Sequence, residues 1–397
     1  MNMLHDQDVV IVGYARTPVG DFLGSLKDVP LVDLACTAGR EALSRAGVKP
    51  EQVDELAMGC IFKHGNKGNP ARQAQIRLGI PVSAWAYTID QQCASGMRAA
   101  DCIGKSLKTG DCQIGLAIGA ESMSRAPYLS LDARGGLRMG DAKFVDTLTH
   151  DGLFCAIENY HMGVTAENLA TEYHISREEQ DELALLSHRR ACAAIESGRM
   201  KKQIVPVEVK TKKGAVTVDT DEHPRKNISL ESLAGLSPAF LKGGTVTAGN
   251  ASGINDGAAA IVLTTAKYAR ENALTPIAKI RSSCSFGVEP RIMGIGPAYA
   301  VPKAIARAGL TEQDIGYYEI NEAFAAQFLA VNRVLRLDME KVNANGSGIS
   351  LGHPVGCTGT RIIVAAIAEL QDRKETFGVA SLCVGGGPAM AVVLEML

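Results

Sequence analysis

Three short segments of this chain occur twice in the same order, and this internal repeat restricts the fold more than any other feature. ALSRAG, SGMR and LAIG match AIARAG, TGTR and LCVG at a nearly constant offset: residues 42–47 with 304–309, 95–98 with 358–361, and 116–119 with 382–385. One match of small residues would mean little, whereas three in order indicate a duplication. We therefore expect two similar halves that pack together.

Short apolar runs alternate with helical patterns in the first half. We expect strands at residues 9–12, 55–62, 86–90 and 114–118. A helix that begins near Leu31 is predicted to end at Gly47, with Pro50 just beyond it, and another helix opens at Ser95 and Gly96. This alternation predicts an α/β fold with a parallel or mixed sheet covered on both faces.

The middle of the chain has the character of an insertion. Between about residues 121 and 246 strand-like runs nearly vanish and charged helices appear. The clearest helix starts at Ser176, where Ser-Arg-Glu-Glu supplies a capping box, and ends at Gly198. We predict an N-terminal half of residues 1–120 and 247–272, an inserted loop domain of residues 121–246, and a C-terminal half of residues 273–397.

Composition narrows the class of protein. The chain has 397 residues, 46% of them hydrophobic and 21% charged, which suits two or three domains. Lys and Arg number 41 against 43 Asp and Glu, without a basic tract, so we expect no nucleic-acid partner. The N-terminus resembles neither a signal nor a transit peptide, and no apolar stretch is long enough to span a bilayer. Ten cysteines without CxxC pairs indicate free thiols in a reducing cytoplasm, not disulfides or a metal site.

Four reactive or polar side chains stand beside predicted strands: Cys93, Asn321, His353 and Cys383. Ligands of α/β sheets bind at the carboxyl ends of strands, so we expect these four side chains to converge there. His353 lies in the run NGSGISLGHPVG, whose glycines allow a close approach to a ligand and whose Pro354 stiffens the chain. Such a loop would hold one imidazole still, as a base requires.

Each of these residues also has a purely structural interpretation. A free cysteine is commonly a small buried hydrophobe, but a helix N-terminus after Cys93 favours a thiolate with a lowered pKa. The three glycines after Cys383 either form a tight turn or expose backbone N–H groups to an oxyanion. Asn321 would equally suit a helix cap, and an isolated HPxG is most simply a turn.

Five motifs around these residues resemble those of the thiolases, in the same order. They are CASGMRA around Cys93, GNASGIND around Ser252, NEAFA around Asn321, GSGISLGHPVGCTG around His353 and CVGGGPA around Cys383. The resemblance extends from ARTPVG near the N-terminus to the last strand. It implies the thiolase fold, in which two βαβαβαββ halves form a five-layer αβαβα sandwich with a loop domain inserted in the first half.

The resemblance assigns a role to each residue of the site. Cys93 would be the nucleophile that is acylated, and His353 the base that activates it. Cys383 would exchange the α-proton of the second acyl-CoA. Asn321 would hold a water that stabilises the thioester oxyanion together with His353, and the amides of Cys93 and Gly385 would form a second oxyanion hole. The chemistry needs such groups, because a weakly acidic α-proton leaves only as its enolate oxygen is stabilised.

The resemblance also implies a coenzyme A site along the loop domain, with coenzyme A and acyl-CoA as substrates and no prosthetic group. The residues carried over are Leu153, His161, Met162, Arg225, Phe240, Ala248, Ser252, Ala323 and Phe324. Arg225 suits the phosphates, and Phe240 offers an apolar surface to the pantetheine arm. From the sequence alone, Arg225 is more simply an exposed charge in DEHPRK, and Leu153 and Phe324 equally suit the core.

The choice of a subtype within the thiolases rests on fewer residues. His161-Met162-Gly163 and Met293 resemble the short-chain, biosynthetic type, which implies an acetyl-CoA C-acetyltransferase that reversibly condenses two acetyl-CoA to acetoacetyl-CoA and CoA. GCTG at 356–359 and Pro388 depart from that type, which leaves open a broader 3-ketoacyl-CoA thiolase of fatty-acid breakdown.

Two other classes share the scaffold. A decarboxylating ketoacyl synthase typically pairs its cysteine with two histidines or with His and Asn, so Cys383 disfavours it. A non-catalytic acyl-CoA carrier would be expected to lose catalytic residues, yet all four are present. The resemblance also implies a homotetramer, a dimer of dimers with contacts through the loop domain.

Overall fold

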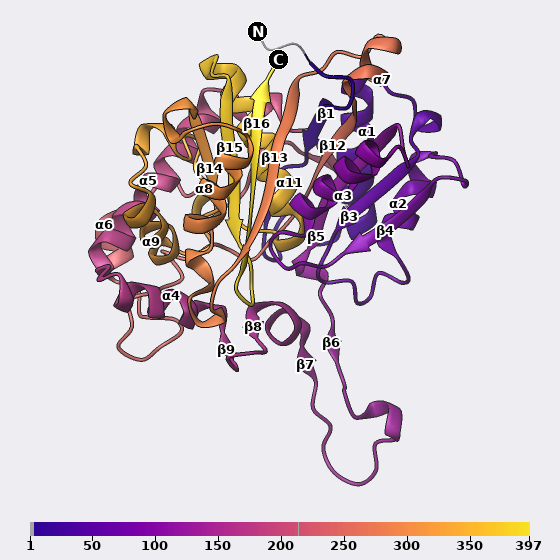
Figure 1. The fold of residues 1–397 in the computed structure, drawn as a ribbon. Coiled ribbons are helices and arrows are strands. Elements are labelled where there is room, and N and C mark those ends of the chain that lie inside the picture. The colour runs from indigo at the N-terminus through magenta and orange to yellow at the C-terminus, as the bar shows by residue number, and fades with distance from the viewer. Residues whose placement is uncertain (1–3, 213) are drawn as a thin grey trace.

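A hydrogen-bonded path of strands passes through both halves of the computed structural model, which describes residues 4–212 and 214–397 (Figure 1). The sheet has ten strands in the order β14-β15-β16-β13-β1-β12-β5-β3-β4, with β2 paired to β12. They are β1 (Val9–Arg16), β2 (Gly20–Asp21), β3 (Glu55–Gly59), β4 (Trp85–Ile89), β5 (Ile114–Ser122), β12 (Asn255–Thr265), β13 (Ala278–Gly287), β14 (Tyr317–Ile320), β15 (Phe377–Cys383) and β16 (Pro388–Met396). Parallel pairs such as β3–β5 and β14–β15 combine with antiparallel ones, which confirms the predicted mixed sheet.

Helices cover the strands on both sides and also lie between them. Those of the two halves are α1 (Leu31–Ala46), α2 (Pro70–Leu78), α3 (Ser95–Thr109), α7 (Ala266–Glu271), α8 (Pro297–Arg307), α9 (Ala325–Leu335), α10 (Gly348–Leu351) and α11 (Val355–Arg373). α3 and α11 pack on each other, and α11 contacts β5 and β12 of one half and β14 and β15 of the other. α1 and α2 cover the N-terminal strands, and α8 covers the C-terminal ones. This is the predicted αβαβα order.

The strands of the two halves are joined where β1 meets β13. Val10 pairs with Lys279 and Ile11 with Ala278, in antiparallel register. The strands therefore form one continuous path, a link that the repeat did not predict.

Equivalent glycines of the repeat lie where α3 crosses α11. A Cβ atom on Gly96 would lie 2.6 Å from Thr360 Oγ1, and one on Gly359 would lie 2.4 Å from the backbone nitrogen of Met97. Because these distances are shorter than van der Waals contact, glycine is required for the helices to approach this closely. The repeat thus preserves a packing contact, and that contact places the first turns of the two helices side by side.

Most helices and strands end close to the positions that the sequence patterns predict. α1 ends at Gly47, which has the left-handed φ of 65° that glycine accepts readily. β3 ends at Gly59, earlier than predicted, because the backbone N–H groups of Ile61 and Phe62 donate to the Glu121 carboxylate. β5 extends to Ser122, two residues beyond the expected domain boundary. None of the described helices is both long and apolar enough to cross a membrane.

Between β5 and β12 the residues that the structure describes form three α-helices and three small two-stranded sheets. They comprise α4 (Met162–Glu172), α5 (Arg177–Glu196), α6 (Leu230–Ala234), β6 (Tyr128–Leu129), β7 (Val145–Asp146), β8 (Phe154–Cys155), β9 (Tyr160–His161), β10 (Val207–Thr211) and β11 (Gly214–Val218). The capping box is confirmed: Ser176 Oγ accepts from the Glu179 N–H, and the Glu179 carboxylate accepts from the Ser176 N–H.

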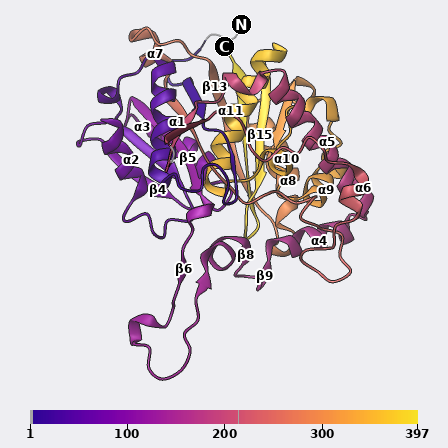
Figure 2. The ribbon, with the colours of Figure 1, turned by 180° about the vertical axis from the view of Figure 1, so that it is seen from behind.

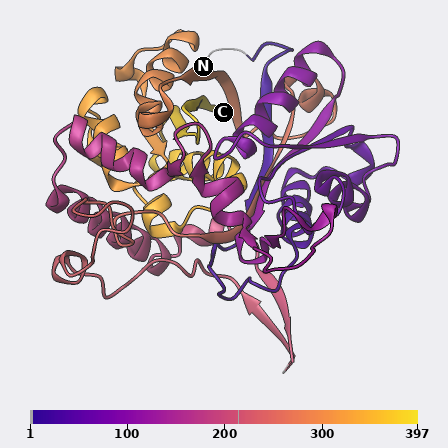
Figure 3. The same ribbon diagram turned by 90° about the horizontal axis from the view of Figure 1, so that it is seen from below.

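Two parts of this insertion project from the molecule. β6 and β7 lie at the base of a long arm (Figures 1 and 2). β10 and β11 form a hairpin that points away from the body (Figure 3). The expectation that strands nearly vanish here is wrong for this hairpin. The alternating sequences VEVKT and GAVTV carry the strand pattern without a continuous apolar run.

Candidate active site

Loops from both halves meet around one cavity of about 360 Å³. Cys93 precedes α3, His353 precedes α11 and Gly385 follows β15, and all three line this cavity. The close crossing of α3 and α11 brings the first two loops together. Cys383, at the buried end of β15, is close enough to Cys93 for the charge on one thiolate to affect the other.

Cys93 and His353 line this cavity, whereas Cys383 and Asn321 are not among its lining residues. Asn321 follows β14 and is fully buried. Its Oδ1 lies 2.7 Å from the position that a Cβ atom on Gly348 would occupy, so a glycine at 348 makes room for the amide. Neither amide atom of Asn321 has a hydrogen-bond partner among the described residues. The side chain can therefore bind a small polar molecule without breaking a protein contact.

His353 is held as a neutral imidazole. Its backbone N–H donates to Asn255 Oδ1 (3.0 Å), and its Nδ1 lies 2.6 Å from Thr358 Oγ1. The Thr358 hydroxyl donates to the Pro354 carbonyl (3.0 Å), so we assign the ring proton to Nδ1 and a lone pair to Nε2. Burial, assisted by the positive charge of Arg361, lowers the pKa of His353 to about 3. The imidazole is a proton acceptor at neutral pH.

The pKa of the Cys93 thiol is raised, contrary to the expectation from the helix N-terminus. Burial raises it to about 11, although hydrogen bonds from the backbone N–H groups of Gly385 and of Cys93 itself act in the opposite direction. Desolvation of the thiolate outweighs these amides. Cys93 is therefore a neutral thiol at rest and needs a nearby proton acceptor to become a nucleophile.

Glycines turn the chain sharply just after Cys383. Gly386 and Gly387 have φ values of 87° and 108°, which favour glycine. A Cβ atom on Gly385 would lie 2.8 Å from Met162 Cε, so the backbone closely approaches the cavity wall. Burial, and next the charge of Cys93, also raise the pKa of the Cys383 thiol. Cys383 is therefore protonated at neutral pH.

All nine residues assigned to coenzyme A by resemblance line the same cavity: Leu153, His161, Met162, Arg225, Phe240, Ala248, Ser252, Ala323 and Phe324. The His161 and Phe240 rings stack with centroids 4.6 Å apart, and Phe324 meets Phe240 edge-on at 6.0 Å. These rings form an aromatic surface. Arg225 is exposed at the cavity and is available to an anionic group.

Several residues of the wall were not predicted: Gln92, Met123, Gly152, His223, Ala239, Ala251, Gly253, Ile254 and Val355. Ala251, Gly253, Ile254 and Val355 lie inside motifs quoted above, and Gln92, Gly152, His223 and Ala239 lie within two positions of an assigned residue, so extending each assignment by one or two positions would have found them. Met123 carries no such signal, because only folding places it here.

Glu121 is a further buried carboxylate next to the His353 loop. It accepts hydrogen bonds from the backbone N–H of Gly356 (2.9 Å) and from those of Ile61 and Phe62. Burial raises its pKa to about 7, and the backbone hydrogen bonds oppose that rise. Glu121 thus ties the loop after β3 to the first turn of α11.

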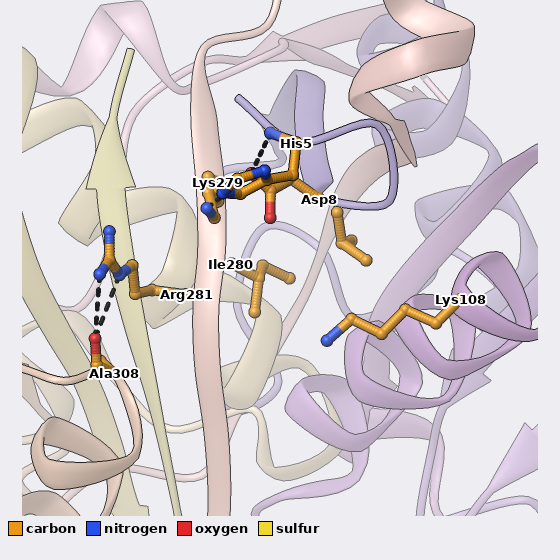
Figure 4. A pocket seen from close by; sticks show the side chains of 8 residues that line it. His5, Asp8, Lys108, Lys279, Ile280, Arg281 and Ala308 are labelled. Atoms are coloured by element: carbon orange, nitrogen blue, oxygen red, sulfur yellow. Dashed lines mark hydrogen bonds and ion pairs between the residues drawn. The ribbon is translucent and has the colours of Figure 1, made fainter. Parts of the chain in front are cut away.

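A second cavity, of about 560 Å³, lies near the first residues of β1 and β13 and the last turn of α3 (Figure 4). Its lining includes none of the residues assigned to the active site. Two of its cations are already paired, Lys279 with Asp8 (2.6 Å) and Arg281 with Glu395 (2.9 Å). Within residues 4–212 and 214–397, no group of three or more His, Cys, Asp or Glu side chains is arranged to hold a metal ion.

Known proteins match nearly the whole chain. Residues 9–267 match the family model of the thiolase N-terminal domain, and residues 274–396 that of the thiolase C-terminal domain. An acetyl-CoA acetyltransferase of Cupriavidus necator is 49% identical over 389 residues, which cover 98% of this chain and 99% of that protein. One of Escherichia coli is 48% identical over 392 residues, or 98% and 100%.

Solved structures also match this chain over nearly its whole length. The acetyl-CoA acetyltransferase of Syntrophomonas wolfei superposes with a TM-score of 0.97 at 48% identity, covering 99% of this chain and 100% of that one. Human mitochondrial 3-ketoacyl-CoA thiolase gives 0.96 at 41% identity, with the same coverage. Matches of this extent to both family domains, together with the five-layer fold, show that the chain belongs to the thiolase family.

Proposed function

We propose that this protein is an acetyl-CoA C-acetyltransferase, which condenses two acetyl-CoA to acetoacetyl-CoA and CoA reversibly through an acetyl-cysteine. The proposal rests on one observation above all: a neutral thiol, Cys93, and an imidazole with a free Nε2 lone pair, His353, line one cavity. It is supported by the similarity to the acetyl-CoA acetyltransferases of three bacteria.

In the first half-reaction Cys93 loses its thiol proton to His353 Nε2, and the thiolate attacks the carbonyl carbon of acetyl-CoA. The carbonyl π pair moves to oxygen, which the backbone N–H groups of Cys93 and Gly385 stabilise. When the C–S bond to CoA breaks, the CoA sulfur takes the proton from His353. Because a thioester replaces a thioester, the energy of the bond is preserved for the second step.

In the second half-reaction the Cys383 thiol gives its proton to His353 Nε2, and the Cys383 thiolate then removes a methyl proton from a second acetyl-CoA. The oxygen of the resulting enolate accepts a hydrogen bond from the protonated His353 Nε2 and one from a water that Asn321 holds. The enolate carbon attacks the acetyl group on Cys93, the C–S bond to Cys93 breaks, and acetoacetyl-CoA is released. The Cys93 thiolate takes the proton from His353 Nε2, and Cys383 keeps the proton that it removed from the substrate, which restores both thiols and the neutral imidazole.

Coenzyme A lies in this proposal along the inserted segment, residues 121–246, and the loop at 248–252. Arg225 binds its phosphates, and the aromatic surface around Phe240 packs against the pantetheine arm. We also propose a cytoplasmic homotetramer, with the arm around β6 and β7 in contacts between subunits. Leu137 and Met139 of that arm are exposed, as an apolar contact surface requires.

The test is incubation with acetyl-CoA alone. We expect CoA release, acetoacetyl-CoA formation and an acetyl adduct on Cys93. A folded protein that releases no CoA and carries no adduct would contradict the proposal and favour an acyl-CoA carrier.

A broader 3-ketoacyl-CoA thiolase is the second candidate, supported by the human mitochondrial enzyme's TM-score of 0.96. Comparing kcat/KM for thiolysis of acetoacetyl-CoA with that of medium-chain 3-ketoacyl-CoAs separates the two. Equal or better turnover of a medium-chain substrate would replace the first proposal with the second.

A further inference from the structure

A histidine outside the proposed mechanism lies on the cavity wall. His223, between β11 and α6, is 8% exposed and lines the cavity with Arg225, Ser252 and Gly253. A Cβ atom on Gly253 would lie 2.5 Å from Cε1 and 2.8 Å from Nε2 of His223. The edge of the ring that carries Nε2 therefore faces the loop along which the pantetheine arm is proposed to run.

Asp21 fixes the orientation of this ring. His223 Nδ1 is hydrogen-bonded to Asp21 Oδ1, and this bond is the main reason why the pKa of Asp21 is lowered. Since the carboxylate only accepts, Nδ1 carries a proton, and in the neutral ring Nε2 is then the acceptor. No hydrogen bond to Nε2 occurs among the residues that the structure describes. The lone pair is thus available to a ligand.

The same carboxylate supports the loop that carries His353. Asn255 Nδ2 donates to Asp21 Oδ1 (3.4 Å) and to the Gly20 carbonyl (3.0 Å), while its Oδ1 accepts the His353 N–H (3.0 Å). Asn255 is fully buried. One hydrogen-bond chain therefore connects His223 on the binding wall with the backbone of the proposed base.

Charge decides which part of coenzyme A the ring contacts. The Asp21 carboxylate bonded to the ring offsets any positive charge there, so the pair offers no net positive charge to a phosphate. The neighbouring His188 ring, 6.2 Å away, adds no positive charge at neutral pH, because burial lowers its pKa to about 4. The cation near the cavity mouth is Arg225, which is exposed, whereas His223 lies deeper.

We propose that His223 is a substrate-binding residue whose Nε2 accepts a hydrogen bond from an amide N–H of the pantetheine arm. The ligand class is a pantetheine thioester, and the inference rests on the proposed function for its substrate. Asp21 is then a positioning residue that serves the binding wall and the His353 loop together.

The experiment uses His223→Asn in the full-length enzyme, assayed with acetyl-CoA and with acetyl-pantetheine, which lacks the nucleotide and its phosphates. Asn keeps an N–H donor toward Asp21 and removes the Nε2 acceptor. We expect KM to rise roughly 2- to 12-fold for both substrates, the worth of one ordinary hydrogen bond, with kcat within about twofold. His174→Asn, at an exposed histidine outside the cavity, is the matched control and leaves both constants unchanged.

Three outcomes would overturn the inference. A rise in KM for acetyl-CoA but not for acetyl-pantetheine means that His223 contacts a phosphate. A fall in kcat with unchanged KM means that His223 acts only on the His353 loop. Unchanged kcat and KM mean that His223 does not contact the substrate. A thermal melt coincident with that of the unsubstituted protein verifies folding, and the KM comparison of two substrates is informative even if stability falls. Failure of the proposed function is recognised separately, because the unsubstituted protein would then form no acetyl-enzyme.

Discussion

Replacing Thr358 with Val should slow acylation of Cys93 by removing the hydroxyl that selects the His353 tautomer. The substitution exchanges a hydroxyl for a methyl group of similar size at a fully buried position in α11. In the unsubstituted protein Nδ1 donates to Thr358 Oγ1, because the hydroxyl proton is committed to the Pro354 carbonyl. Valine leaves the Nδ1–H without an acceptor.

The size of the effect follows from that unsatisfied donor. Leaving a buried donor without a partner costs about 1–3 kcal/mol. The imidazole avoids this cost by moving its proton to Nε2, which is then no longer the acceptor that Cys93 needs. If the active tautomer becomes less stable by that amount, acylation slows roughly 5- to 150-fold, at about 1.4 kcal/mol per tenfold.

The assay is single-turnover acetylation by acetyl-CoA, followed by intact-mass spectrometry. Thr358→Ser keeps the hydroxyl and should acetylate within about threefold of the unsubstituted rate. If Thr358→Val folds normally and also acetylates within twofold, the tautomer of His353 does not depend on Thr358 and our assignment of its proton is wrong.

Three further predictions concern other parts of the site. Cys93→Ala should form no acetyl adduct, whereas Cys383→Ser should still form one. Cys383→Ser should lose deuterium exchange into the methyl group of acetyl-CoA, because a hydroxyl is far less acidic than a thiol. An adduct on Cys93→Ala would show that the two roles are reversed. In His353→Ala, the rate at which iodoacetamide labels Cys93 should rise about tenfold per pH unit up to about pH 11, since burial keeps the thiol protonated below that pKa. A labelling rate that stops rising near pH 7 would refute the raised pKa. Gly359→Ala should lower the free energy of unfolding, measured in urea, by about 1–3 kcal/mol, because the new methyl group would lie 2.4 Å from the Met97 nitrogen. Unchanged stability would mean that the helices can separate freely. Gly104→Ala in α3 is the control, because its methyl group would meet nothing closer than Val9 Cγ1 at 3.7 Å.

The sequence by itself determined the two-half architecture and pointed to the candidate reactive residues. The repeat contains Gly96 and Gly359, and the structure shows why both persist: their missing side chains set how closely α3 and α11 pack. Local patterns such as the Ser176 capping box and the Gly47 helix end were readable, because the interactions that make them lie within a few residues.

Properties that depend on distant segments were decided only by the tertiary structure. The helix N-terminus after Cys93 predicted a lowered pKa, but burial by loops of both halves reverses the sign, and no local pattern reports desolvation. The backbone of His353 is held by Asn255, about a hundred residues earlier, and the His223 ring is oriented by Asp21, about two hundred residues earlier. Chemistry can be read from residue types, whereas charge state and orientation arise from neighbours that only folding brings together.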